Sequence, residues 1–181
     1  MTEKAKMLSG KWYFPGDDEL VAHQILARKL LRKFNHAEIS DEKRKAILAK
    51  LLGSIGKGSN VESLFSCDYG FNVHLGKMVG LNFGCVLLDC GRIEIGDYTL
   101  LGPGVHIYAV THPLEPVKRR GGPLSENCKG VPVKIGRDCW IGGGSRICLV
   151  SRSAMAVSLV LAVSSRTMCL PAQKWLAIRL D

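Results

Sequence analysis

Residues 95–107 read IGDYTLLGPGVHI, and their aliphatic side chains recur every six positions, at Ile95, Leu101 and Ile107. A glycine directly follows the first two of these residues. A repeating unit of an aliphatic residue followed by a small one is typical of one face of a three-sided parallel β-helix. The aliphatic side chain points inward and stacks on neighbouring coils, and the small residue permits a tight corner.

The same spacing of six occurs in two further trios, and three such units make one coil of about 18 residues. The trios are Leu75, Leu81 and Leu87, and Ile135, Ile141 and Ile147. The sequence therefore predicts an all-β core, built as a parallel β-helix over residues 59–148. Residues 109–130 interrupt the register, and we expect an extended loop between two coils there. A loop of this length in a compact domain is usually functional or disordered.

Residues 1–58 are expected to form a small α-helical domain before the β-helix. Asp17 and Asp18 can cap a first helix, and Ser40 and Asp41 open a second one that Gly53 ends. The apolar positions are Leu20, Ile25, Leu26, Leu30 and Phe34 in the first helix, and Ile47, Leu48, Leu51 and Leu52 in the second.

Composition limits the classes of function and location. The formal net charge is +9, but the chain has no long basic run and no interleaving of basic and aromatic residues, so we expect no nucleic-acid partner. The longest apolar stretch, residues 154–163, is too short to span a bilayer, and we expect no membrane partner. The seven cysteines form no C-x-x-C pair. Their odd number and the lack of a secretory signal favour a cytoplasmic protein.

Four segments of the repeat resemble a known family. They are DYGFNVHLG (68–76), GLNFGCVLLD (80–89), IGDYTLLGPGVHIYAVTHPLEP (95–116) and PVKIGRDCWIGGGSRI (132–147). They are similar to the maltose and galactoside O-acetyltransferases of the hexapeptide-repeat family, as are GKWYFPGDDEL and LLRKFNH in the helical region. The resemblance covers about residues 3–148. It implies a left-handed β-helix, a homotrimer with active sites between adjacent subunits, and acetyl-coenzyme A as cosubstrate, with no metal.

The resemblance also implies roles for single residues. His112 in THPLEP corresponds to the general base, and an imidazole suits the removal of a proton from a sugar hydroxyl at neutral pH. Asn82 corresponds to an asparagine of the acceptor site, although it could instead stack in a β-helix corner. Asp17, Asp68 and Asp89 match acidic positions that contact the acceptor, and Asp17 could equally be a helix cap.

Further residues correspond to the cofactor site or depart from the family pattern. Trp140 and Gly143 match the part of the repeat that borders coenzyme A, and the rest of that site falls after residue 148. Cys90 stands where some members carry a second acidic residue, which leaves the acceptor preference open among maltose, glucose and galactosides. The basic residues 118–120 could bind a phosphate group of the cofactor, or they could form a solvated turn.

The six-residue spacing stops after Cys148. If one nucleotide had been lost from the coding sequence, the reading frame after it would be shifted. Each original codon would then consist of the last base of one present codon and the first two bases of the next. The pair Met155–Ala156 then becomes a glycine, and aliphatic residues return at positions 153, 159 and 165. We therefore interpret residues 149–181 as a frameshifted reading that replaces the last coils. The alternative is a divergent natural tail.

Two rival functions remain open. A zinc carbonic anhydrase on the same kind of β-helix would use three histidines, for which His74, His106 and His112 are the candidates. A product without catalytic activity would follow if the altered tail removes the last coils, because an uncovered β-helix end leaves apolar surface and open strand edges.

Overall fold

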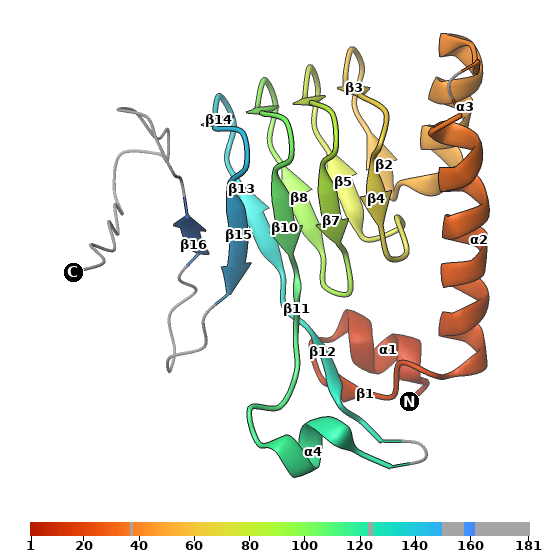
Figure 1. Ribbon diagram of the computed structural model, residues 1–181, viewed down its shortest axis with the longest axis vertical. Helices are drawn as coiled ribbons and strands as arrows, with labels where there is room; N and C mark the ends of the chain where they lie inside the picture. The colour runs from red at the N-terminus through yellow and green to blue at the C-terminus, as the bar shows by residue number, and fades with distance from the viewer. Residues whose placement is uncertain (37, 123–124, 150–157, 162–181) are drawn as a thin grey trace.

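The structure of the chain is a computed structural model, and it describes residues 1–36, 38–122, 125–149 and 158–161 (Figure 1). Its elements in chain order are α1 (Glu3–Leu8), β1 (Trp12–Tyr13), α2 (Asp18–Phe34), α3 (Asp41–Leu51), β2 (Ser54–Ile55), β3 (Asn60–Val61), β4 (Ser66–Cys67), β5 (Val73–Leu75), β6 (Gly80–Leu81), β7 (Val86–Leu88), β8 (Ile93–Ile95), β9 (Leu100–Leu101), β10 (His106–Tyr108), β11 (Val110–Thr111), α4 (Pro116–Arg120), β12 (Cys128–Gly130), β13 (Val133–Ile135), β14 (Trp140–Ile141), β15 (Arg146–Leu149) and β16 (Ser158–Leu161).

Three parallel sheets form the faces of a β-helix. Their strand orders are β2-β5-β8-β13, β3-β6-β9-β14 and β4-β7-β10-β15, with β16 added beside β15. Each coil therefore contributes one strand to each face. The expected coil of about 18 residues is corrected to 20 in the first three coils, where Ile55 pairs with Leu75 and Leu75 with Ile95. The six-residue spacing holds within each coil, and two further residues connect one coil to the next.

Residues with the six-residue spacing fill the interior of this β-helix. Each trio is one coil, and equivalent members stack on the same face, so that Leu75 pairs with Ile95 and Ile95 with Ile135. All nine aliphatic residues of the three trios are at most 6% exposed. Their stacking forms a continuous apolar column, as the spacing predicts.

One coil begins earlier than the sequence pattern suggests. β2 pairs in parallel with β5, so Ile55 opens a first coil before residue 59. Val61 and Cys67 continue that coil opposite Leu81 and Leu87. The boundary expected near residue 58 is therefore corrected to about residue 54. It was missed because a cysteine takes the third aliphatic position.

Helices α2 and α3 cover the first coil at one end of the β-helix (Figure 1). Asp17 and Ser40 are their N-caps, as expected. The predicted apolar face of α2 is partly wrong, because Ile25 and Leu26 are 57% and 51% exposed. The buried stripe of α2 consists of Leu20, Ala27, Leu31 and Phe34.

The expected loop at residues 109–130 contains secondary structure. β11 and β12 pair antiparallel within it, and β1 from the N-terminal region pairs antiparallel with the other side of β12. The short helix α4 lies between β11 and β12, away from the coils (Figure 1). The loop is thus anchored by a small sheet, β1-β12-β11, that joins the two ends of the excursion to the N-terminal region.

The interpretation of residues 149–181 as a frameshifted tail lies largely outside the described residues. In the described part, β16 pairs antiparallel with β15, whereas all other strand pairs on the three faces are parallel. This pairing is not the register of a further coil. No helix in the described ranges has the length and apolar character needed to cross a membrane.

Gly96 tests the physical reason for the glycines in the repeat. A Cβ at this position would lie 2.6 Å from the backbone nitrogen of Arg137 in the next coil. We expect Gly96→Ala to lower the free energy of unfolding by about 2 kcal/mol, because the corner is overpacked. Gly142→Ala is the matched control, since its nearest described neighbour atom is 4.0 Å away. Equal urea midpoints for the two variants would contradict the stacking argument.

Candidate functional site

His112 directly follows β11 and is exposed. Its Nδ1 atom lies 2.8 Å from the backbone oxygen of Asn127. Because a carbonyl oxygen can only accept a hydrogen bond, Nδ1 carries the proton and donates it. The neutral ring then has its lone pair on Nε2, the atom that faces away from Asn127. The contact therefore selects the tautomer of a general base.

Backbone and side-chain hydrogen bonds hold Asn127 in place. The Asn127 amide donates to the carbonyl oxygen of Arg119 at 3.0 Å. Arg119 in turn donates to the carbonyl oxygens of Pro113 and Leu114, at 3.2 and 3.0 Å. Arg119 is thus engaged by the loop itself, which fits the expectation of a solvated turn better than that of a phosphate contact.

The N-terminal strand β1 supports β12, the strand that begins directly after Asn127. Tyr13 pairs with Cys128, the residue after Asn127, and the Cys128 thiol donates to the Tyr13 hydroxyl at 3.1 Å. Sequence patterns did not identify Tyr13, Asn127 or Cys128. A two-residue strand has no periodicity, and the role of Asn127 resides in its backbone oxygen, so the residue type carries no signal.

A buried cluster lies beneath this sheet and includes Tyr13, Tyr69, Cys90 and Cys128. Burial raises the pKa of both tyrosine hydroxyls, so they stay protonated. The hydrogen bond with Cys128, together with burial, also raises the pKa of the Cys90 thiol. The Cys90 thiol donates to Oδ2 of Asp68, with the two atoms 3.6 Å apart. Cys90 thus contacts Asp68 as a neutral donor.

Asp89 is fully buried and serves the turn that presents Asp68. Its Oδ1 accepts from the backbone N–H groups of Asp68 and Tyr69, at 3.0 and 2.8 Å, and its Oδ2 accepts from that of Asn72 at 3.2 Å. Burial raises the pKa of Asp89 to about 6. The expected contact between Asp89 and an acceptor does not fit this geometry, because the side chain is 0% exposed.

Asp68 is partly exposed and lies at the same corner of the β-helix as Cys90. Burial raises the pKa of its carboxyl group. Asp17, by contrast, has a clear structural role, since its Oδ1 accepts from the N–H groups of Glu19 and Leu20 at 3.2 and 3.4 Å. The helix-cap alternative for Asp17 therefore describes what the side chain does in this chain.

Asn82 and Trp140 lie along a different face, β3-β6-β9-β14. A groove of about 370 Å³ runs over this face, and its lining includes Asn82, Phe83, Leu100 and Trp140. Leu100 and Trp140 pair across adjacent coils and are 53% and 60% exposed. Gly143, in the turn after β14, is also exposed. The groove is apolar at its Trp140 end.

A single chain keeps the two halves of the expected site apart. The β11–α4–β12 excursion with His112 leaves one edge of the β-helix, and the strands β3 and β14 lie toward the opposite edge (Figure 1). Asn82 follows β6, between these two strands in the same sheet. His112 and Asn82 thus belong to different edges of one molecule.

The histidines proposed for a carbonic anhydrase have separate partners. His74 contacts Ser54 and Arg92, His106 contacts Tyr108, and His112 contacts Asn127. In the part of the chain that the structure describes, no group of three His, Cys, Asp or Glu residues is placed to hold a metal ion.

Comparison with known proteins agrees with the fold. Residues 6–56 match the maltose acetyltransferase hexapeptide capping motif. The chain is 40% identical over 147 residues to Nodulation protein L of Rhizobium leguminosarum bv. viciae, covering 81% of this chain and 75% of that protein. A solved maltose O-acetyltransferase from Clostridium difficile 630 is 46% identical with a TM-score of 0.73, covering 81% of this chain and 76% of that one.

A hexapeptide-repeat acetyltransferase from Vibrio cholerae, solved with acetyl-coenzyme A, is 28% identical with a TM-score of 0.65, covering 81% of this chain and 80% of that one. Fold, motif and relatives define a hexapeptide-repeat acetyltransferase. Within that class, the chain belongs to the maltose O-acetyltransferase family, and its β-helix is the left-handed one of these enzymes. The family and fold expected from the sequence are confirmed.

Asp89 offers a test of the turn that presents Asp68. We expect Asp89→Ala to lower the free energy of unfolding by about 3 kcal/mol or more, because three backbone N–H groups lose their acceptor. Asp97→Ala is the matched control, since Asp97 accepts from one exposed N–H group, that of Lys77. Urea denaturation measures both, and a loss for Asp89→Ala no larger than for Asp97→Ala would contradict the assignment.

Proposed function

We propose that this protein transfers an acetyl group from acetyl-coenzyme A directly to a hydroxyl group of a sugar, with His112 as general base. The observation that carries the proposal is the hydrogen bond from Nδ1 of His112 to the Asn127 oxygen, which leaves Nε2 as the proton acceptor. The membership of the family and the acetyl-coenzyme A complex of the Vibrio cholerae relative support the choice of reaction.

The proposed reaction needs one proton carrier. Nε2 of His112 removes the proton of the sugar hydroxyl while its oxygen attacks the thioester carbonyl. The C–S bond breaks as the new ester forms, and the imidazolium returns the proton to the leaving thiolate of coenzyme A. The Nδ1–H···O contact with Asn127 stabilises the imidazolium formed between these steps.

The groove beside Trp140 fits the cosubstrate. Coenzyme A reaches its thioester through a long pantetheine arm, and the exposed side chains of Phe83, Leu100 and Trp140 offer apolar surface for such an arm. Gly143, exposed in the next turn, leaves room for close approach. Asn82 lies toward the other end of this groove, where an acceptor hydroxyl would meet the thioester.

We further propose that the enzyme is a homotrimer with its active sites between adjacent copies. His112 and Asn82 lie at opposite edges of one chain, so a site that uses both needs two chains. Around a threefold axis, each copy offers His112 and Asp68 from one edge and Asn82, Gly143 and Trp140 from the other. Asp89 then positions Asp68 by accepting a hydrogen bond from its backbone N–H group. Asp17 contributes only indirectly, as the N-cap of helix α2.

His112→Ala tests the base. We expect its turnover of acetyl-coenzyme A with glucose or maltose to fall by about 10²–10⁴-fold, the usual contribution of general base catalysis. The measurement is the release of the coenzyme A thiol. His36→Ala, an exposed histidine of the helical region, is the control and should keep the wild-type rate. An undiminished rate for His112→Ala would contradict the assignment of His112 as general base.

Mixed trimers test the shared site. When His112→Ala and Asn82→Ala chains are co-expressed in equal amounts, about one quarter of the sites combine an intact His112 with an intact Asn82 of the neighbour. We expect the mixture to recover about a quarter of the wild-type rate, although each variant alone is nearly inactive. If the purified mixture stays as inactive as its parents, the site is formed within one chain.

A second candidate is a chain that has lost turnover because its last coils are altered. The antiparallel pairing of β16 with β15 favours it, since a regular further coil would be parallel. Mass spectrometry of the C-terminal peptides from the native source decides whether TMCLPAQK is translated. If it is translated and wild-type protein releases no coenzyme A, the second candidate holds and the first is rejected for this chain.

A further inference from the structure

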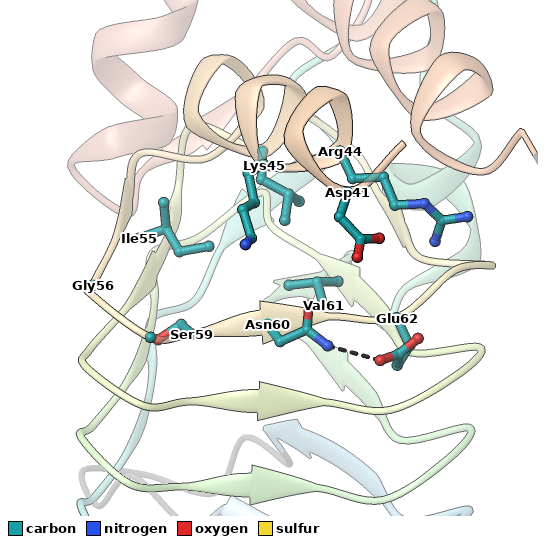
Figure 2. Close-up of a pocket in the computed structure, with 11 residues that line it drawn as sticks. Asp41, Arg44, Lys45, Ile55, Gly56, Ser59, Asn60, Val61 and Glu62 are labelled. Atoms are coloured by element: carbon teal, nitrogen blue, oxygen red, sulfur yellow. Dashed lines mark hydrogen bonds between the residues drawn. The ribbon is translucent and has the colours of Figure 1, made fainter. Parts of the chain in front are cut away.

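A cleft of about 620 Å³ lies between helix α3 and the first coil of the β-helix, outside the site described above. Figure 2 shows Asp41 and Lys45 extending from α3 toward strand β3. Asn60 and Glu62 face them from β3 and the turn that follows it, with the Asn60 amide donating to Glu62 at 2.7 Å. The cleft thus has hydrogen-bonding groups on both walls.

The chemistry of the cleft suits a neutral polyhydroxyl ring. Its apolar lining consists of Leu48, Ile55 and Val61. Leu48 and Val61 are 3% exposed, and the partly exposed Ile55 offers the surface that can pack on the C–H face of a ring. Its rim carries two cations, Arg44 and Lys45, and two carboxylates, so neither an anion nor a cation is favoured overall. Nε of Arg44 is buried and has no hydrogen-bond partner among the described residues. The guanidinium carbon lies 5.8 Å from the centre of the Phe34 ring, so the Arg44 side chain packs against α2.

The cleft continues into the groove of the proposed active site. Asn60 and Glu62 line both spaces. The register that pairs Val61 with Leu81 puts Glu62 beside Asn82 on the adjacent coil, about 4.8 Å away, which is one strand spacing. One face therefore runs from the apolar Trp140 end, past Asn82, to the polar cleft under α3.

We propose that the cleft under α3 binds a non-reacting sugar unit of an acceptor that has two or more rings. The inference rests on the proposed function, because it takes Asn82 as the place where the reacting ring sits. The apolar end of the face holds the cosubstrate, and the polar end extends the acceptor site away from it. The enzyme would then prefer oligosaccharides to monosaccharides.

Binding of sugars to the full chain tests this inference without depending on turnover. Ligand-observed NMR titrations would compare glucose with maltotriose and cellotriose, and N-acetylglucosamine with chitotriose. We expect at least one trisaccharide to bind about tenfold more tightly than its monosaccharide, which corresponds to about 1.4 kcal/mol. If none of the three binds more tightly than its monosaccharide, the inference is overturned.

A double variant assigns the preference to the cleft. In Asp41→Asn/Lys45→Met, we expect the tenfold preference to shrink to about twofold, with the affinity for the monosaccharide unchanged. Glu42→Gln/Lys50→Met is the matched control, because both residues are exposed on the same helix and do not line the cleft. A preference that survives in the cleft variant, or is lost equally in the control, overturns the inference.

Coenzyme A release by the wild-type chain separates this inference from the proposed function. If no sugar supports release but the trisaccharide preference depends on Asp41 and Lys45, the proposed function fails and the cleft remains a sugar site. If glucose and the trisaccharides are acetylated equally well and bind equally well, the function holds and the cleft assignment fails.

Discussion

The stacking of one coil on the next is the constraint on which the rest of the structure depends. Each short strand finds its hydrogen-bond partners only in neighbouring coils, as where Gly76 N–H donates to the Ile95 oxygen and Gly96 N–H to that of Ile135. Behind these bonds, one aliphatic side chain from each strand enters a common column. A single coil cannot pair the backbone N–H and C=O groups of its own strands, so each coil is stabilised by its neighbours. The coils at both ends of the column must therefore be covered by other elements.

The cover at the N-terminal end also serves the site. Helices α2 and α3 close the first coil with Leu31, Phe34 and Leu48. The same N-terminal region sends β1 across to β12, next to the Asn127 oxygen that orients His112. The helical region is therefore joined to the loop that carries His112 and, through the cleft under α3, to the face that carries Asn82.

Sequence reasoning proposed those parts of the site whose chemistry resides in the side chain of a recognisable motif. His112, Asn82 and Trp140 stand out because the motifs THPLEP, GLNFG and WIGGG that contain them resemble those of the family. For Asp89 the resemblance implied a contact with the acceptor, whereas the structure buries the side chain and uses its carboxylate as an acceptor for backbone N–H groups. The sequence also predicted that Ile25 and Leu26 belong to the buried face of α2, but both are exposed. The presence of an apolar residue in a helix does not by itself indicate that the residue faces the core.

By itself, the sequence determined the β-helix, its three faces and the corner glycines, since a period of six with an aliphatic residue at each step fits only such stacked coils. It also predicted the family, which the comparisons confirm, and through that resemblance it pointed to His112 as the proposed base. The tertiary structure alone decided that Asn127 selects the tautomer of His112, that β1 braces this contact, and that His112 and Asn82 lie at opposite edges of one chain. These features arise from backbone groups and from segments far apart in the chain, and neither leaves a local pattern of residue types.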